Sequence, residues 1–367
     1  MTKRNRITQY VLPLVAILLL AASASYGQTS SPAPGVGSML GQVAFKQNCG
    51  YLSGVGSGVG IGITFDGSSL WYSCYNTKLA TVSGTDLTPA PYDLLKADPK
   101  TGAVLAAYNI QGGTGAIAYD QKRNVIWAAE GDGCNDVGLW GCDNQVKVLQ
   151  VPLDTNQNVI IPTCTTPPCP PAPLYTVAFS VPQAYGDLIH SPVATTGFTQ
   201  NIVDGLAIDG ATDTLYIHYD FAPYIATYNA TTGLFLGFIA ESSGISGEVG
   251  LGTGPSNPYG LGCVVSGLAI GGTTLFQASD YCDHIWAVDK TTQAASFDFD
   301  FSSSVSSFSN FDDKTLTCDP KTFGNLGDAV WVKEPYDPQT AFAFTIPTCS
   351  CGIGGKPATG SCKPKKK

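Results

Sequence analysis

Five copies of one pattern run along this chain, and no other feature restricts its fold as strongly. In each copy, a short apolar stretch is followed by a polar turn and then by an aliphatic-aromatic pair. Repeats built from such short β-rich pieces are typical of sheets arranged as blades around an axis. The aliphatic-aromatic pairs are Leu70-Trp71, Ile126-Trp127, Leu215-Tyr216, Leu275-Phe276 and Val330-Trp331.

Each copy predicts four antiparallel strands. The apolar stretch forms the inner strand, the aliphatic-aromatic pair lies in the second, and a third strand ends in a turn of the form Asp/Asn-x-x-Thr-Gly. A fourth strand closes the blade and is expected at residues 103–110, 234–240 and 294–301 in three of the copies. We therefore expect an all-β fold, a single β-propeller over residues 38–348 that is stabilised by disulfide bonds.

The spacing of the pairs leaves the number of blades open. The pairs begin at residues 70, 126, 215, 275 and 330, so the steps between them are 56, 89, 60 and 55 residues. The long step contains a Pro- and Cys-rich insertion, at about residues 142–200, because proline at this density does not fit a central strand. An extra blade around Leu174 to Val181 would make six blades, the number we favour. Five blades remain the alternative.

The two ends of the propeller are expected to meet. An unclosed propeller exposes a sheet edge, so Ser38 to Phe45 are predicted to add a strand to the C-terminal blade. Residues 28–37 are expected to form a flexible segment before it. Residues 349–367 are expected to form a basic tail that contains cysteines.

The first residues have the pattern of a secretory signal. Three basic residues precede an apolar stretch at residues 11–22, and Ala22-Ser23-Ala24 offers small residues for cleavage. Residues 1–27 are therefore predicted to be a signal peptide, which places the mature protein outside the cell or in a periplasm. A retained N-terminal anchor is the alternative; no membrane association is expected of the mature form.

The cysteine content agrees with export. The chain has 12 cysteines, an even number, so all of them can pair in an oxidising compartment. Zinc binding is the alternative for the C-terminal cluster, although its spacing does not match a zinc motif. Local bridges are expected within Cys134/Cys142, Cys164/Cys169, Cys263/Cys282 and the cluster of Cys349, Cys351 and Cys362.

The net charge argues against one class of partner. The full chain carries −9, and removal of the three basic residues of the signal leaves −12. A surface of this sign repels nucleic acids and anionic membranes. We therefore expect no nucleic-acid partner.

Two segments resemble a known propeller family. Gly267-Leu-Ala-Ile, followed by Leu275-Phe276 and by Asp283-His284-Ile285, is similar to the NHL repeat, although Asp283 and a missing Arg depart from it. Asp204-Gly-Leu-Ala resembles the Asn-Gly-Leu-Ala of the SMP-30 (gluconolactonase) group, in which the Asn is a metal ligand. The resemblance implies a six-bladed propeller and a divalent metal bound through Asp204.

Acidic residues follow several of the aliphatic-aromatic pairs and are expected at one mouth of the propeller. Converging carboxylates suit Ca²⁺ or another divalent cation, which would polarise a lactone or ester carbonyl. His218, expected in an inner strand next to these acids, is a candidate general base or metal ligand, and Asp204 and His218 form the catalytic hypothesis. The alternative is that these acids only stabilise turns and neighbouring blades. The predicted metal ligands are Glu130, Asp204, Asp220 and Asp280.

Two classes of function follow. The first is a propeller that binds a small molecule, glycan or protein on its loop face without catalysis. The second is a metal-dependent lactonase or esterase of the SMP-30 type. A streptogramin-lyase-like enzyme and a structural surface protein are weaker alternatives. No organic cofactor is expected, because the chain has no motif for one.

Overall fold

We analysed a computed structural model of the chain. The compact unit that carries the fold is Pro34–Lys367, and the expected signal peptide lies outside the described residues. The structure describes residues 34–46, 60, 62–74, 92–110, 114–129, 145–162, 173–182, 203–219, 224–240, 265–279, 283–302, 304, 315–334, 340–347 and 350–353.

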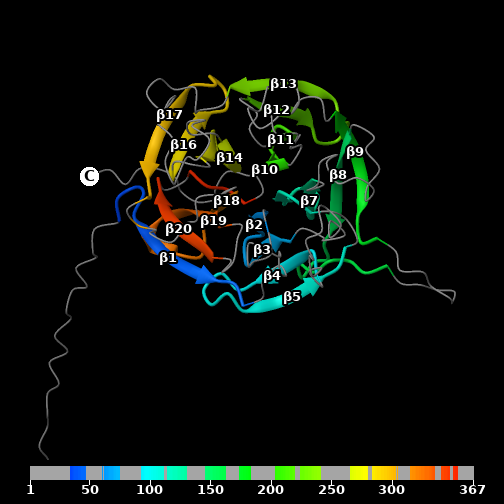
Figure 1. Ribbon diagram of the computed structural model, residues 1–367, viewed down its shortest axis with the longest axis horizontal. Coiled ribbons are helices and arrows are strands. Elements are labelled where there is room, and N and C mark those ends of the chain that lie inside the picture. Colours follow the sequence, from blue (N-terminus) through cyan, green and yellow to red (C-terminus); the bar gives the residue numbers. More distant parts are fainter. Residues whose placement is uncertain are drawn as a thin grey trace, which may run out of the picture. The chain divides into compact units, whose positions relative to one another are not determined.

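The described strands form five four-stranded antiparallel sheets around a common axis (Figure 1). The first sheet consists of β2 (Ile63–Phe65), β3 (Leu70–Ser73), β4 (Leu94–Ala97) and β5 (Val104–Tyr108). The second consists of β6 (Ile117–Asp120), β7 (Val125–Ala129), β8 (Gln145–Pro152) and β9 (Thr176–Pro182). The third consists of β10 (Val203–Asp209), β11 (Thr214–Tyr219), β12 (Tyr224–Asn229) and β13 (Phe235–Ala240).

The last two sheets complete the ring. The fourth consists of β14 (Val265–Gly271), β15 (Thr274–Ser279), β16 (His284–Asp289) and β17 (Ala295–Asp300). The fifth consists of β18 (Thr315–Asp319), β19 (Asp328–Lys333), β20 (Thr340–Ile346) and β1 (Met39–Ala44), with a short 3-10 turn at Gly324–Leu326. We number the sheets as blades 1 to 5 in this order.

The ring closes with five blades. The inner strands contact one another in the order β2, β6, β10, β14, β18 and back to β2. The preference for six blades is therefore corrected to five, the other number left open. The residues around Leu174 to Val181 form β9, the outer strand of blade 2, and so they do not form an additional blade.

The predicted closing strand is confirmed. β1 pairs antiparallel with β20, with Gln42 opposite Phe342 and Val43 opposite Ala341. The outer edge of the last blade is thus supplied by the beginning of the propeller sequence. This pairing joins the two ends of the ring without a covalent bond.

A carboxylate at the end of the inner strand stabilises the turn in four of the blades. In blade 1, Asp66 accepts hydrogen bonds from the backbone N–H groups of Ser68 (2.7 Å) and Ser69 (2.8 Å) through Oδ1. Its Oδ2 accepts the indole N–H of Trp71 at 2.8 Å. Blades 2 and 5 repeat the indole bond, from Trp127 to Asp120 (3.1 Å) and from Trp331 to Asp319 (2.9 Å).

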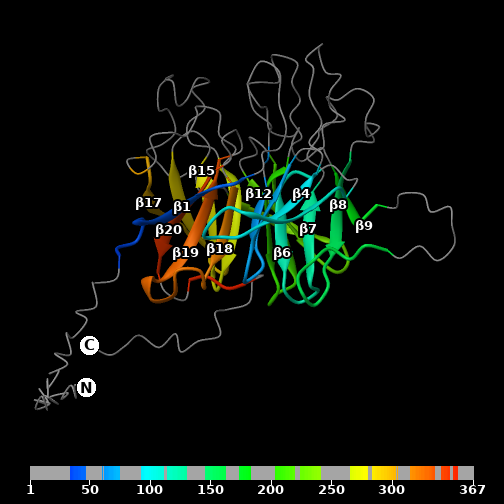
Figure 2. The same cartoon turned by 90° about the horizontal axis from the view of Figure 1, so that it is seen from below.

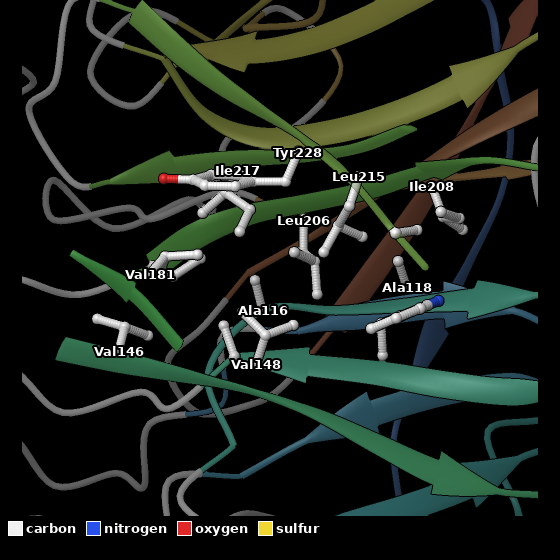
Figure 3. Close-up of a cluster of buried hydrophobic side chains, with 14 of the residues drawn as sticks. Ala116, Ala118, Val146, Val148, Val181, Leu206, Ile208, Leu215, Ile217 and Tyr228 are labelled. Atoms are coloured by element: carbon white, nitrogen blue, oxygen red, sulfur yellow. The ribbon is translucent and has the colours of Figure 1, made fainter. Parts of the chain in front are cut away.

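Apolar side chains fill the space between neighbouring blades. Between blades 2 and 3, residues from β6, β8 and β9 meet residues from β10, β11 and β12 (Figure 3). Burial of such side chains is the main source of stability in a fold of this kind. The labelled residues of this cluster are Ala116, Ala118, Val146, Val148, Val181, Leu206, Ile208, Leu215, Ile217 and Tyr228.

Hydroxyl groups connect some of the inner strands near the axis. The Thr317 hydroxyl of blade 5 accepts the Phe65 N–H of blade 1 at 3.0 Å. The Thr64 hydroxyl of blade 1 accepts the Tyr119 N–H of blade 2 at 2.8 Å. The same position is alanine in blades 2, 3 and 4, so those blades lack this bond. The three alanines are Ala118, Ala207 and Ala269.

An ionic network joins blades 2 and 3 on the surface. Arg123 contacts Asp213 at 2.5 Å and Asp120 at 2.7 Å, and Lys122 contacts Asp213 at 3.0 Å. Partial burial alone would raise the pKa of Asp213. Hydrogen bonds from Thr231, Arg123 and Lys122 outweigh that effect and hold its pKa well below the usual range.

The hydroxyl bonds predict a pair of opposite stability changes. Thr64→Val leaves the buried Tyr119 N–H without its acceptor and should lower the free energy of unfolding by about 1–2 kcal/mol. Ala118→Thr should supply the corresponding acceptor to the Ile208 N–H and raise that free energy by up to about 1 kcal/mol. Urea unfolding measures both, with the exposed Thr212→Val as control. Equal effects of Thr64→Val and Thr212→Val would contradict the role of the bond.

The network around Asp213 predicts a pH-dependent contribution to stability. Because the folded-state pKa is depressed, the contribution is complete above the unfolded pKa of about 4 and is lost as the pH falls below it. Asp213→Asn should therefore cost about 1 kcal/mol at pH 7. The difference in Tm between wild type and Asp213→Asn should shrink as the pH is lowered toward 3. A difference that stays constant would show that the charge of Asp213 does not stabilise the fold.

Candidate functional site

The two ends of the propeller differ in their connections. Because neighbouring strands are antiparallel, the turns after the first and third strands of each blade lie at one end, which we call the hairpin end. The connections after the second and fourth strands lie at the other, which we call the loop end. The strands are seen from the side in Figure 2. Of the predicted site residues, Asp204 and His218 lie in strands at their loop ends.

Three of the four predicted metal ligands fall outside the described residues. Glu130 is the residue after β7, Asp220 is the residue after β11, and Asp280 is the residue after β15. Each of these strands ends at the loop end. Their convergence at one mouth stays a prediction.

The backbone of Asp204, the fourth predicted ligand, lies at an irregularity of β10. The register of β10 with β11 shifts between Val203, opposite Tyr219, and Gly205, opposite His218. Asp204 is therefore the extra residue of a β-bulge. Bulges redirect a side chain relative to the regular strand and are frequent beside binding sites.

His218 lies beside this bulge and has no exposed surface. A Cβ atom on Gly205 would lie 3.0 Å from the Cβ of His218 and 2.6 Å from the carbonyl oxygen of Ser266 in blade 4. Glycine at position 205 thus lets His218 of blade 3 and the Ser266 carbonyl of blade 4 pack closely against it. The proposed role of His218 as a general base stays a prediction.

His218 occupies a register position that carries a polar side chain in two other blades. This position lies two residues after the aromatic residue of the pair, at the loop end of the second strand. It is occupied by Ser73, Ala129, His218, Ala278 and Lys333 in blades 1 to 5.

Ser73 and Lys333 both bind the first residues of the next blade. The Ser73 hydroxyl accepts the Gly62 N–H at 2.7 Å and donates to the Gly115 carbonyl at 2.6 Å. The fully buried Lys333 ammonium donates to the carbonyl of Gly60 and, at 3.2 Å, to that of Glu334. These bonds hold the loop ends of neighbouring blades together, at the seams between blades 1 and 2 and between blades 5 and 1.

A second buried polar group fixes the loop end of blade 1. The Thr114 hydroxyl lies 2.8 Å from the Asp93 carbonyl and 2.9 Å from the Cys74 carbonyl. The Asp93 carboxylate accepts the Ile110 N–H at 2.6 Å. Cys74 is itself disulfide-bonded. Sequence reasoning selected neither Asp93 nor Lys333; the register position shared with Ser73 would have identified Lys333.

Burial also changes the chemistry of a tyrosine beside these seams. Tyr72 is fully buried, and its ring stacks on Phe45 with 4.2 Å between the centroids. Desolvation raises the pKa of Tyr72 well above its usual range. Tyr72 therefore stays neutral at physiological pH.

The cavity on the axis near the hairpin end is small. The inner strands of all five blades line a cavity of about 30 Å³, and Gly352 of the C-terminal segment completes its wall. A water molecule needs about 10–15 Å³ measured in this way, so the cavity holds about two. A sugar, lactone or peptide cannot enter it.

The described residues contain no group of three or more His, Cys, Asp or Glu side chains that is placed to hold a metal ion. The expected calcium site depends on residues that are outside this part of the chain. Within the same residues, no helix is long and apolar enough to cross a membrane.

Comparison with known proteins gives likenesses of fold. No protein-family model matches the chain, and no curated protein matches it. The aldose sugar dehydrogenase of Streptomyces coelicolor, solved with PQQ, is 12% identical with a TM-score of 0.43, and the match covers 86% of this chain and 99% of that one. A luciferin-regenerating enzyme is 12% identical with a TM-score of 0.41, and the match covers 84% of this chain and 95% of that one. Identities this low concern the fold alone.

The seam between blades 5 and 1 generates a prediction. Lys333→Met keeps the apolar part of the side chain but leaves the Gly60 carbonyl without this donor, which should cost about 1–3 kcal/mol of unfolding free energy. Lys100→Met, in an exposed turn, should change the stability by less than about 0.5 kcal/mol. Urea unfolding at neutral pH measures both. Equal stability of the two variants would contradict the role assigned to Lys333.

Proposed function

We propose that this protein is an exported β-propeller that binds a small molecule, glycan or protein at its loop end without catalysing a reaction. One observation carries the proposal: most of the long connections leave the described strands at the loop end. Connections held by a rigid scaffold are the usual carriers of binding residues. The long connections at this end are residues 75–91, 130–144, 183–202, 241–264 and 303–314.

The hairpin end offers less to a ligand. Its inner-strand carboxylates are occupied by turn amides, by indole N–H groups or, at Asp209, by Lys290 at 2.5 Å. The axial cavity behind them admits only water. Groups that are already satisfied within the fold add little to the binding of a partner. These facts support the loop end as the binding face.

The composition of the loop-end connections favours glycans among the three ligand classes. They contain aromatic residues and few basic ones, and Trp140, Tyr185 and Tyr259 are examples. Aromatic rings combine a large apolar face with a polar tip, which suits the amphipathic faces of sugars. A glycan is therefore the first ligand to test.

The second candidate function is a metal-dependent lactonase or esterase. The position of Asp204 in a β-bulge, directly before Gly205 and beside His218, favours it. Glu130, Asp220 and Asp280 would complete the ligand set. A bound Ca²⁺ or other divalent cation would polarise the carbonyl of the substrate.

Export is part of the proposal. Cys318 and Cys351 form a disulfide bond, and such bonds persist in oxidising compartments outside the cytosol. This supports cleavage of residues 1–27 as a signal peptide and a secreted or periplasmic location.

The binding proposal is tested on a glycan array with protein purified without chelator. We expect binding of a restricted set of glycans that Trp140→Ala weakens about tenfold or more. Leu326→Ala, at an exposed position of the hairpin end, should leave binding unchanged. Equal binding by the two variants, or no binding to glycans or other ligands, would contradict the proposal.

The enzymatic candidate is tested on the same preparation by metal analysis and by a lactone and ester screen. The binding proposal expects no turnover. About one divalent ion per chain, lost together with activity in a folded Glu130→Gln/Asp204→Asn/Asp280→Asn variant, would establish the hydrolase instead. Turnover that survives removal of all divalent metal would exclude that hydrolase mechanism.

A further inference from the structure

The chain continues past the last strand and crosses the hairpin end of the propeller. Residues 350–353 follow β20 and run close to the axis, where they form the short red segment near the centre of Figure 1. Gly352 lines the axial cavity together with the inner strands of all five blades. Ile353 packs against the apolar cluster between blades 1 and 2, which includes Trp71 and Tyr119. We call residues 350–353 the strap.

Blade 4 is altered where the strap passes. Four blades end their inner strand with the carboxylates Asp66, Asp120, Asp209 and Asp319, whereas blade 4 has Gly271. A Cβ atom at position 271 would overlap the carbonyl oxygen of Ser350 and lie 2.8 Å from the Cα of Cys351. Any larger residue at this position would therefore push the strap away.

Two bonds fasten the strap to blade 5. Cys351 is disulfide-bonded to Cys318 of the inner strand β18, with 5.4 Å between the Cα atoms. The Cys351 N–H donates to the Asp328 carboxylate at 2.9 Å. Cys351 has no exposed surface, and Cys318 is 6% exposed.

Backbone amides face the cavity that the strap covers. The Phe65 and Tyr119 N–H groups donate to threonine hydroxyls of the preceding blades, and all four residues line the axial cavity. The equivalent amides belong to Ile208, Ile270 and Cys318, and the preceding blade has alanine at the position of the threonine. Their exchange with solvent therefore depends on access to the axis.

We propose that residues 350–353 are a strap that covers the axial amides at the hairpin end, with the Cys318–Cys351 disulfide as its latch. Loss of this disulfide frees the strap and uncovers the axial amides.

Hydrogen exchange on the full chain tests the strap. In Cys318→Ala/Cys351→Ala, the amides of Ile208, Ile270 and residue 318 should exchange about tenfold faster or more, while those of the outer strand β13 keep their rates. Ser350→Ala changes the strap but keeps the latch, and should behave as wild type. Unchanged exchange rates of the axial amides in the double variant would show that the disulfide does not hold the strap in place. A uniform increase over all strands would show that the disulfide only stabilises the fold.

A second variant covers the case in which the double alanine variant does not fold. Gly271→Ala keeps both cysteines but places a methyl group where the Ser350 carbonyl lies. It should accelerate exchange at the same axial amides while the disulfide remains intact by mass spectrometry. Wild-type exchange rates at the axial amides in this variant would overturn the proposal. They would show that displacing the strap by the added methyl group does not expose these amides. Glycan binding at the loop end should not change in any of these variants.

Discussion

The rest of the propeller depends on a single carboxylate that ends the inner strand in four of the five blades. In blades 1, 2 and 5, one oxygen of this group satisfies turn amides while the other accepts an indole N–H from the second strand. The tryptophan is thereby held against the next blade. In blade 3, where the aromatic residue is Tyr216, the second oxygen of Asp209 binds Lys290 of blade 4 instead. The same carboxylate thus stabilises the local turn and holds a side chain that packs between blades.

Much of the fold is predictable from the sequence, because the turn carboxylate and the aliphatic-aromatic pair are local signals. They predicted four-stranded blades, and the closing role of residues 38–45 followed from the need to cover a sheet edge. The number of blades was harder, since the long step contains a strand that differs from the repeat. The Cys318–Cys351 bridge was also missed. Local spacing favoured bonds among Cys349, Cys351 and Cys362, whereas the bridge follows from the path of the strap across the ring.

The site was less accessible to sequence reasoning than the fold. The three acidic residues that directly follow a second strand, Glu130, Asp220 and Asp280, were selected from the sequence. They lie outside the described residues, and their role stays a prediction. The bulge at Asp204 is a register shift between β10 and β11 of blade 3 that the repeat pattern does not reveal. The close packing of Gly205 and His218 against Ser266 involves two blades, which no single repeat contains. Lys333 was not selected from the sequence because its role depends on its position in the second strand, which it shares with Ser73 and His218. Only alignment of the five second strands places it at the level of Ser73 and His218.

The pairing of β1 with β20 also sets an order of events during synthesis. The register places Met39 opposite Phe344, so a ribosome has made nearly the whole chain before the last blade can be completed. Contacts this distant in sequence form late and slowly. Until then, the first propeller strand has no partner, and the growing chain exposes the edges of blades 1 and 5. The last blade therefore cannot be completed until residues 340–346 are available to pair with β1.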